Sequence, residues 1–515
     1  MDENRSDFGL FRTASNILSN LTLFAAELLV SFWYTPYLLR NIGIELFGFI
    51  PLANSLTGFL SIITSSLNIS TSRYITVELE KGLVERANQV FNTMFISTSL
   101  LVSATIPIGA ALALLAPVIF SIPHGEDKQI QLLFFGVLAA FLLSILSINF
   151  KVATFAKNRF DLRNIVIFIE RLVQIGVIVL LFNLKQPMIA YVGVGALIAA
   201  MSGFFGDFIL WKELLPILHL KLASFRKEFL GMLFRTSSWT YLYQVGFIFF
   251  LNTDMLVANR VLDLRLAGMY GALLVISKNL RVLSMAVGGV WGPSILSRYS
   301  KSDYQGMDSI VKISTKVIGL TVALPVGFVC GVAGPFLFFW LGPEFKVMSG
   351  VLICLTIHLV SNLIVGPYFN IQISFNKLRI PAIVAFCLGT LNVFLMALFA
   401  RWFGTMGIAI AGALTLTGYY SIFAPIYTAR IMGYEWWRYI VRLFPIYAVM
   451  VGVAAVSYSI TVFLPTTSLI QLILEGMVIT LVYFLFVYQF VLASEEKEKV
   501  KSLLDILSQL VNKRD

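Results

Sequence analysis

Long apolar stretches, separated by short polar segments, run through almost the entire chain. Each stretch has at least about 20 residues, enough for a helix rising 1.5 Å per residue to cross a hydrocarbon core about 30 Å thick. Because the stretches are continuously apolar and do not alternate, they favour helices over barrel strands. They predict fourteen membrane-spanning helices, at residues 14–38, 44–69, 90–120, 131–155, 164–183, 187–211, 236–259, 267–296, 310–340, 348–375, 380–400, 404–428, 438–463 and 468–493.

A faint internal repeat relates two parts of this pattern. Arg40 precedes Gly48 by eight residues, and Arg260 precedes Gly268 by the same interval. The two pairs are 220 residues apart, which corresponds to six predicted helices. Because six is even, the repeat predicts two halves of the same orientation, related by an axis along the membrane normal. The last two helices fall outside the repeat.

The polar connections are short. The longest one on the side of the N-terminus, residues 212–235, mixes cations with Leu and Phe, so we expect it to lie on the cytoplasmic membrane surface. In the tail, residues 495–515, apolar residues recur at helical spacing and predict an interfacial amphipathic helix, with a partner-binding helix as the alternative. The connections on the other side have no more than about ten residues, which leaves no room for a catalytic domain.

Composition and charge then place the chain in a membrane. Of its 515 residues, 58% are hydrophobic and 13% charged, with a formal net charge of +11. Among the 38 Lys and Arg residues, 28 lie in segments on the side of the N-terminus, 7 on the other side and 3 inside the spans. This bias predicts that both termini are cytoplasmic, and it explains the basic balance without nucleic acid. We expect a multi-pass protein of a prokaryotic cytoplasmic membrane.

Enzymatic chemistry has no candidate residues. The cysteines and histidines are scattered and lack ligand spacing, so no metal site is expected. The GxxxxGK[ST] phosphate loop and the HExxH and GxSxG motifs are all missing from the sequence. We therefore expect no catalytic residue, no cofactor and no ATP binding of that type. The work would come from an ion gradient, the membrane potential or the cargo gradient.

Two cations stand out inside the predicted spans. Lys278 and Arg281 are three residues apart and share a helix face, and Ser277 and Ser284 extend that polar stripe. Arg281 lies about 20 Å along its helix, too deep for easy snorkelling. The stripe predicts a cationic patch that faces a watery cavity and binds an anion such as a phosphate group. A buried ion pair that fixes helix packing is the alternative.

Two other charges lie deep in the predicted spans. Arg171 shares a face with Gln174, which makes a second cavity-facing stripe. Glu27 lies near the midplane of the first helix, either as a counter-ion for Arg281 or Lys278 or as a site that takes up a proton or Na⁺.

Two further acids lie near the ends of predicted spans. Asp254 is near the outer end of the seventh helix, where either helix packing or an ion site would explain it. Asp207 lies near the cytoplasmic end of the sixth helix beside Lys212, so we expect it to be solvated.

With these features the chain resembles a known group. The stretches GIELFGFIPLANSLTGFLSIITSSLNISTSRYI and NTDMLVANRVLDLRLAGMYGALLVISKNLR look like those of the polysaccharide flippases (Wzx type) of the multidrug/oligosaccharidyl-lipid/polysaccharide exporter superfamily. The resemblance covers nearly the whole chain, although its motifs are loose. It implies an all-α membrane protein with two six-helix lobes, residues 1–211 and 236–428, around a central cavity, and two added helices in residues 429–494.

The resemblance also implies a function. Such proteins move an undecaprenyl-pyrophosphate-linked oligosaccharide from the inner to the outer leaflet by alternating access. Lys278, Arg281 and Arg171 match the cavity cations that would meet the pyrophosphate and sugar acids. Membrane lipids and proteins that polymerise or assemble the polysaccharide are the implied partners.

Three alternatives are weighed against this function. An ion-coupled multidrug exporter would need an acidic cavity and usually has twelve helices. Lipid II flippases of the same superfamily carry cations on the first helix, where this chain has Glu27. A membrane enzyme such as an oligosaccharide polymerase or ligase would normally display a sizeable outer loop, and none is predicted.

Overall fold

A computed structural model of the chain describes residues 2–221, 224–229, 238–288, 291–492 and 497; side chains within helices are described outside residues 2–15, 17, 21, 62–74, 238 and 285–287. The predicted tail helix at 495–515 therefore lies almost wholly outside the described residues, as does part of the connection 212–235. The helices of the N-terminal part are α1 (Asp2–Ile42), α2 (Ile44–Phe47), α3 (Phe49–Glu80), α4 (Val84–Leu114), α5 (Ala116–Ile119), α6 (Asp127–Ala156), α7 (Phe160–Leu184) and α8 (Ala190–Leu214).

The second part of the chain is also helical throughout. Its elements are α10 (Ser238–Leu251), α11 (Asp254–Val261), α12 (Leu264–Gly288), α13 (Trp291–Ser300), α14 (Tyr304–Gly331), α15 (Ala333–Leu341), η2 (Pro343–Met348), α16 (Ser349–Ile357), α17 (Leu359–Ile364), α18 (Gly366–Ser374), α19 (Arg379–Thr417), η3 (Gly418–Phe423), α20 (Ala424–Ile431), α21 (Arg438–Val441), α22 (Phe444–Phe463), α23 (Leu469–Phe486) and η4 (Val487–Val491).

The membrane spans agree with the apolar pattern. Within the described residues, 12 helices are long and apolar enough to cross a membrane, or up to 13 if α10 and α11, which meet at 42°, form one span. The longest range, Arg379–Ile431, holds two predicted spans, because the backbone leaves the helical conformation at Gly404 (φ 58°). A hydrogen bond of 2.8 Å from Thr415 Oγ1 to Asn392 Oδ1 joins the two arms of this hairpin. Each of the fourteen predicted ranges thus corresponds to a helix or a series of helices.

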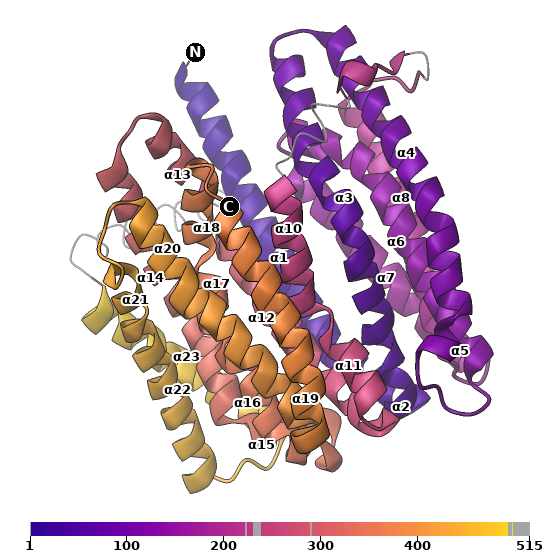
Figure 1. Ribbon diagram of the computed structural model, residues 1–515, viewed down its shortest axis with the longest axis vertical. Coiled ribbons are helices and arrows are strands. Elements are labelled where there is room, and N and C mark those ends of the chain that lie inside the picture. The colour runs from indigo at the N-terminus through magenta and orange to yellow at the C-terminus, as the bar shows by residue number, and fades with distance from the viewer. Residues whose placement is uncertain (1, 222–223, 230–237, 289–290, 493–496, 498–515) are drawn as a thin grey trace, which may run out of the picture.

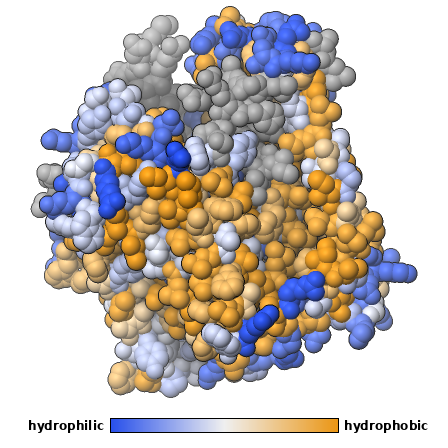
Figure 2. Space-filling view, viewed as in Figure 1, coloured by the Kyte–Doolittle hydropathy of each residue, from blue (hydrophilic) through white to orange (hydrophobic). Residues whose placement is uncertain are grey.

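The helices gather in two bundles (Figure 1). We use the name N-terminal bundle for α3, α4, α6, α7 and α8, which pack on one another, and C-terminal bundle for α10 to α20. Helix α1 lies between the bundles and contacts α7 of the first and both α12 and α15 of the second. Figure 2 shows a broad hydrophobic surface over the middle of the visible face, with hydrophilic residues gathered toward both ends.

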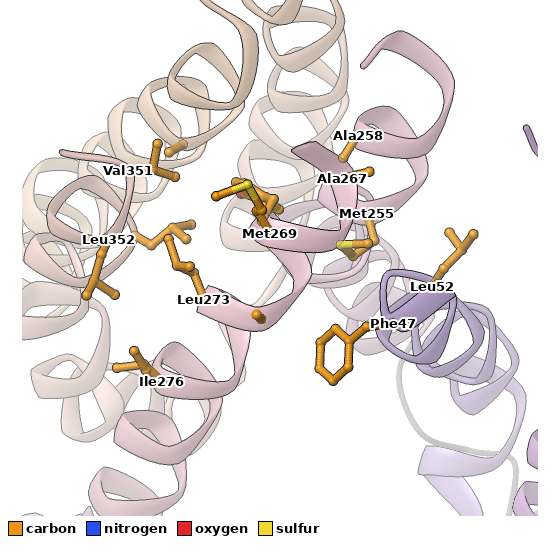
Figure 3. Packing of buried hydrophobic residues seen from close by; sticks show 14 of the residues in the cluster. Phe47, Leu52, Met255, Ala258, Ala267, Met269, Leu273, Ile276, Val351 and Leu352 are labelled. Atoms are coloured by element: carbon orange, nitrogen blue, oxygen red, sulfur yellow. The ribbon is translucent and has the colours of Figure 1, made fainter. Parts of the chain in front are cut away.

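The bundles meet where α2 and the start of α3 pack against α11 and α12. Gly48 and Gly268 approach each other so closely that a Cβ added to Gly268 would lie 1.9 Å from the Ile44 carbonyl oxygen. Phe47 and Met255 belong to the hydrophobic core beside this contact (Figure 3). Small residues allow such close approach of helices in a membrane, where the hydrophobic effect does not drive association. The contact therefore depends on glycine at positions 48 and 268, because any larger residue would place a Cβ between the two backbones.

On the same side, one further contact joins the segment after α5 to the C-terminal bundle, and another joins α1 to that bundle. The Ser121 backbone N–H donates to Asn259 Oδ1 at 3.1 Å, and Asn259 Nδ2 donates to the Ser121 carbonyl at 3.2 Å. Trp340 Nε1 of α15 donates to the Phe32 carbonyl of α1 at 2.8 Å. In the predicted orientation all these residues lie near the outer surface. The bundles are thus closed at the end that the sequence predicts to be extracellular.

Helices α22 and α23 lie outside the two bundles. Helix α22 packs along α14, where Gly327 and Gly331 bring the backbones together: an added Cβ would lie 2.6 Å and 2.5 Å from the carbonyl oxygens of Met450 and Ala454. Tyr483 of α23 donates a hydrogen bond of 2.7 Å to the Leu320 carbonyl of α14. Both added helices are therefore anchored on α14.

Candidate functional site

A cavity of about 500 Å³ lies between the bundles. Its walls come from α2, α3, α10, α11, α12, α16 and both arms of α19, together with Asn252 and His358. The charged side chains that line it are Asp254, Lys278 and Arg281, which carry a formal net charge of +1. The cavity therefore presents an excess of positive charge to whatever enters it.

The two cations face this cavity from α12. The Lys278 side chain is exposed and that of Arg281 is half-buried, although both lie deep among protein atoms, because the surface they expose is that of the cavity. Within the described residues, neither makes an ion pair or a side-chain hydrogen bond. Charges in a membrane protein are normally paired. Here the positions opposite Lys278 and Arg281 are left for a ligand or water.

The serines of the predicted stripe, Ser277 and Ser284, donate hydrogen bonds to backbone carbonyls of neighbouring helices. Ser277 Oγ donates to the Leu355 carbonyl at 3.1 Å, and Ser284 Oγ donates to the Leu363 carbonyl at 3.3 Å. Both are buried, and their bonds join α12 to α16 and α17. Ser277 lines the cavity beside Lys278 and Arg281, as the stripe predicts, whereas Ser284 is not among the lining residues. The hydroxyls of both serines are taken up by carbonyls freed at the breaks in the neighbouring helix.

Asp254 lies at the break between α10 and α11. Its Oδ1 accepts the Met255 backbone N–H at 3.0 Å, and the buried Tyr270 hydroxyl is within its hydrogen-bonding reach. The side chain is buried, with 8% exposed, and lies within electrostatic range of Arg281. Asp254 therefore belongs to the cavity wall and offsets part of the cationic charge without pairing directly with it.

Glu27 and Arg171 pair with each other across α1 and α7. Arg171 Nε lies 3.1 Å from both Glu27 oxygens, and Nη2 lies 2.9 Å from Oε2. The remaining Nη1 donates to Gln174 Oε1 at 2.7 Å. Of the two roles considered for Glu27, the structure contradicts that of a counter-ion for Arg281 or Lys278, because α1 brings Glu27 against Arg171 of α7. The pair lies within electrostatic range of Lys278 but outside the lining of the cavity.

The prediction that Asp207 is solvated was also wrong. It is 3% exposed rather than solvated, accepts a hydrogen bond from the Ser147 hydroxyl and lies 3.6 Å from Lys151 Nζ. Both partners come from α6, against which α8 packs closely where Gly136 meets Gly193. Helix packing, which distance along the sequence does not reveal, removes this carboxylate from water.

Several lining residues were missed in the sequence. Asn54 and Thr57 lie one turn apart on α3, and Asn252 lies at the break after α10. His358, at the break between α16 and α17, is buried and its Nδ1 has no hydrogen-bond partner in the described structure. The spacing of Asn54 and Thr57 within an apolar span was a usable signal. Among the described residues, no group of three Asp, Glu, His or Cys side chains could hold a metal ion.

The fold has known counterparts, although no protein-family model matches the chain. It is similar to the inward-facing form of a multidrug-resistance MATE transporter of the MOP superfamily, with a TM-score of 0.57 over 81% of this chain and 99% of that one, at 15% identity. It is also similar to the lipid II flippase MurJ in an inward closed conformation, with a TM-score of 0.59 over 94% and 99% of the two chains, at 14% identity. The chain is therefore a multi-pass helical membrane protein with the fold of MOP-superfamily transporters.

In sequence, the chain is similar to a bacterial membrane protein. It is 29% identical over 490 residues to the uncharacterized membrane protein EpsK of Bacillus subtilis (strain 168). The alignment covers 94% of this chain and 96% of EpsK, so the similarity extends over nearly the whole length of both proteins.

Proposed function

We propose that this chain is a flippase that moves an undecaprenyl-pyrophosphate-linked oligosaccharide from the cytoplasmic to the outer leaflet by alternating access. The oligosaccharide would be a repeat unit of O-antigen, capsule or exopolysaccharide. The observation that carries the proposal is the pair Lys278 and Arg281, which face one cavity and have no acidic partner within the described residues. Pyrophosphate oxygens would supply the charge-assisted hydrogen bonds that these cations lack.

The charge of the cavity supports an anionic cargo. An exporter of organic cations would be served by free carboxylates, whereas the lining carboxylate, Asp254, already accepts a backbone N–H and lies beside Tyr270 and Arg281. The similarity in fold to MurJ, which is named a lipid II flippase, is consistent with a lipid-linked cargo. Because the fold is equally similar to a multidrug MATE transporter, the charge of the cavity is the feature that favours the flippase.

Neutral groups of the lining suit the sugar part of such a cargo. Asn54 and Thr57 on α3 and Asn252 after α10 contribute amide and hydroxyl groups to the lining of the cavity. Amides and hydroxyls both donate and accept hydrogen bonds, as sugar hydroxyls do. Because these groups come from both bundles, a bound sugar would bridge the surfaces that alternating access must separate.

The proposal also includes the ion that drives transport and the proteins that act with the flippase. Glu27 and Asp254 are the candidates for coupling to Na⁺ or H⁺, and polysaccharide polymerase and assembly proteins are the expected partners. The cytoplasmic position of both termini follows from the distribution of Lys and Arg and belongs to the same proposal.

Transport in reconstituted liposomes tests the role of the cations. The wild type should move a fluorescent lipid-linked oligosaccharide, and Lys278→Gln and Arg281→Gln should each slow it by about tenfold or more, as expected for the loss of a hydrogen bond to a charged group. Lys128→Gln, which alters an exposed lysine outside the cavity, should leave the rate unchanged. Thermal unfolding of each variant checks its folding.

Two results would contradict the proposal. Folded Lys278→Gln and Arg281→Gln variants with full rates would remove the cavity cations from the mechanism. A wild type that moves no such lipid, but moves organic cations against a Na⁺ or H⁺ gradient, would instead be a multidrug exporter. Glu27 and Asp254 would then become the residues to study.

A further inference from the structure

A second charged cavity, of about 570 Å³, lies where α14 meets α21. It shares no lining residue with the central cavity, and the function proposed above does not use it. In the predicted orientation it lies at the cytoplasmic membrane surface. Its side chains combine three cations, one acid and two aromatic rings: Lys312, Arg438, Arg442, Glu435, Tyr434 and Trp437.

Asp308 of α14 holds the two arginines that line this cavity. Arg442 donates to both of its oxygens at 2.9 Å, Arg438 Nη2 donates to Oδ2 at 2.9 Å, and the Tyr439 hydroxyl donates to Oδ1 at 2.9 Å. The start of α14 is itself fixed by Asp303, which accepts the Gly306 backbone N–H at 2.8 Å. The arginines are therefore held in place, and one carboxylate balances only one of their two charges.

Several donors remain unused. The Arg438 side chain is 43% exposed and stacks over the Tyr434 ring at 4.0 Å, so its guanidinium is ordered while part of it stays open. Lys312 lies one turn after Asp308, is exposed, and makes no ion pair or side-chain hydrogen bond within the described residues. With Asp308 and Glu435 counted, the three cations leave a formal charge of +1. The cavity is thus suited to an anion.

Neighbouring side chains fix the depth of this cavity in the membrane. Trp436 and Trp437 are 57% and 47% exposed, and tryptophan favours the interface between water and lipid. On the following turns, Val441 and Phe444 are 47% and 63% exposed and face outward as an apolar surface. The donors of Arg438 and Lys312 therefore lie where headgroups give way to acyl chains.

We propose that this cavity binds the phosphate of an anionic phospholipid of the cytoplasmic leaflet. The phosphate would accept hydrogen bonds from Lys312 and Arg438, and an acyl chain would lie along Val441, at the end of α21, and Phe444, at the start of α22. By balancing the excess positive charge, the lipid would hold α21 and α22 against α14. A soluble phosphate would accept the same hydrogen bonds but would not contact the exposed apolar side chains.

Native mass spectrometry of the full chain, released from nanodiscs of mixed phosphatidylglycerol and phosphatidylcholine, tests the site. The wild type should retain phosphatidylglycerol in preference. Lys312→Gln should weaken this retention about fivefold, as expected for one Lys at an anionic membrane surface. Lys377→Gln, an exposed lysine on the same predicted side but outside the cavity, should change nothing.

Three outcomes would contradict the proposal. Equal retention of both lipids by the wild type, or equal effects of Lys312→Gln and Lys377→Gln, would overturn it. Displacement of phosphatidylglycerol by millimolar inorganic phosphate would show a site for soluble anions instead. Because Lys312 has no partner among the residues that the structure describes, its variant should keep the wild-type melting temperature, so a loss of lipid would not reflect unfolding. Arg438→Gln, in a variant shown to fold, should reduce retention as well.

Discussion

Glu27 and Arg171 form an ion pair in a region where the hydration of charges is poor. The carboxylate and guanidinium keep 25% and 31% of their side chains exposed, and three contacts of 2.9 to 3.1 Å join them. Such two-pronged pairs are among the stronger charge-assisted contacts. Because Lys278 lies within electrostatic range, loss of Glu27 would leave two unbalanced cations near each other.

This pair yields a prediction for stability. Glu27→Gln and Arg171→Gln should each lower the free energy of unfolding by about 1 to 3 kcal/mol, because each leaves a partly buried charge without its partner. The double variant should lose less than the sum of the single losses, since it leaves no unpaired charge. Thermal unfolding of the purified variants in detergent measures all three changes.

The same variants separate two roles of Glu27. If the losses of stability simply add, the pair is not a structural unit. If the folded double variant moves cargo but no longer responds to a Na⁺ or H⁺ gradient, Glu27 takes part in coupling. Unchanged coupling would restrict Glu27 to holding α1 on α7.

At the scale of single residues, the sequence could indicate which positions matter but not their partners. Lys278 and Arg281 were found because an ionisable side chain in an apolar helix is costly. The pairing of Glu27 with Arg171 and the burial of Asp207 depend on which helices are neighbours, a property that periodicity does not contain. His358 was missed because a single histidine carries no spacing signal.

At the scale of elements, the contact between Gly48 and Gly268 joins equivalent positions of the internal repeat. The two glycines lie 220 residues apart, each eight residues after an arginine, and the structure brings them together between α2 and α12. Each half thus contributes the same kind of hairpin to one contact, as in the interface of a two-fold symmetric dimer. The bundles close on each other through matching surfaces.

Gly268→Ala should open this contact. An added Cβ would lie 1.9 Å from the Ile44 carbonyl oxygen, so α2 and α12 would have to separate. In a chain whose native cysteines are replaced, a cysteine introduced at Asn54 in the cavity should then react faster with a membrane-impermeant thiol reagent added outside. The comparison is Gly334→Ala, where nothing lies within 4 Å of the added Cβ. Equal reaction rates in the two variants would show that the glycine contact does not close the cavity.

The elements themselves were well predicted, because long apolar runs need little context. The reversal at Gly404 fell at the first residue of the predicted span 404–428, as a glycine at positive φ allows. The breaks after Leu251 and at His358 were not predicted, since no proline stands there and the apolar pattern continues. These breaks place Asp254 and His358 in the cavity wall, so this part of the site depends on tertiary packing.

At the scale of the whole molecule, alternating access requires the closed end to open. Ser121 and Asn259 join the bundles through two backbone-to-amide hydrogen bonds near the predicted outer surface. Cysteines at both positions, joined by a short thiol crosslinker in a background without native cysteines, should stop transport of the lipid-linked oligosaccharide. Cleavage of the crosslink should restore it, and the liposome assay measures both steps.

A crosslink inside one bundle serves as the control. Cysteines at Asn392 and Thr415, which face each other across the α19 hairpin, should leave transport intact when joined. Continued transport by the fully crosslinked Ser121 and Asn259 variant would exclude a mechanism in which this end opens.

The unpaired cations of the central cavity also have a consequence for the resting protein. Lys278 and Arg281 repel each other and will attract small anions from solution whenever cargo is absent. Loading the cavity would then be an ion exchange, in which chloride or inorganic phosphate leaves as the pyrophosphate arrives. The apparent affinity for cargo should fall as the salt concentration rises, and the released anions would make loading partly entropy-driven.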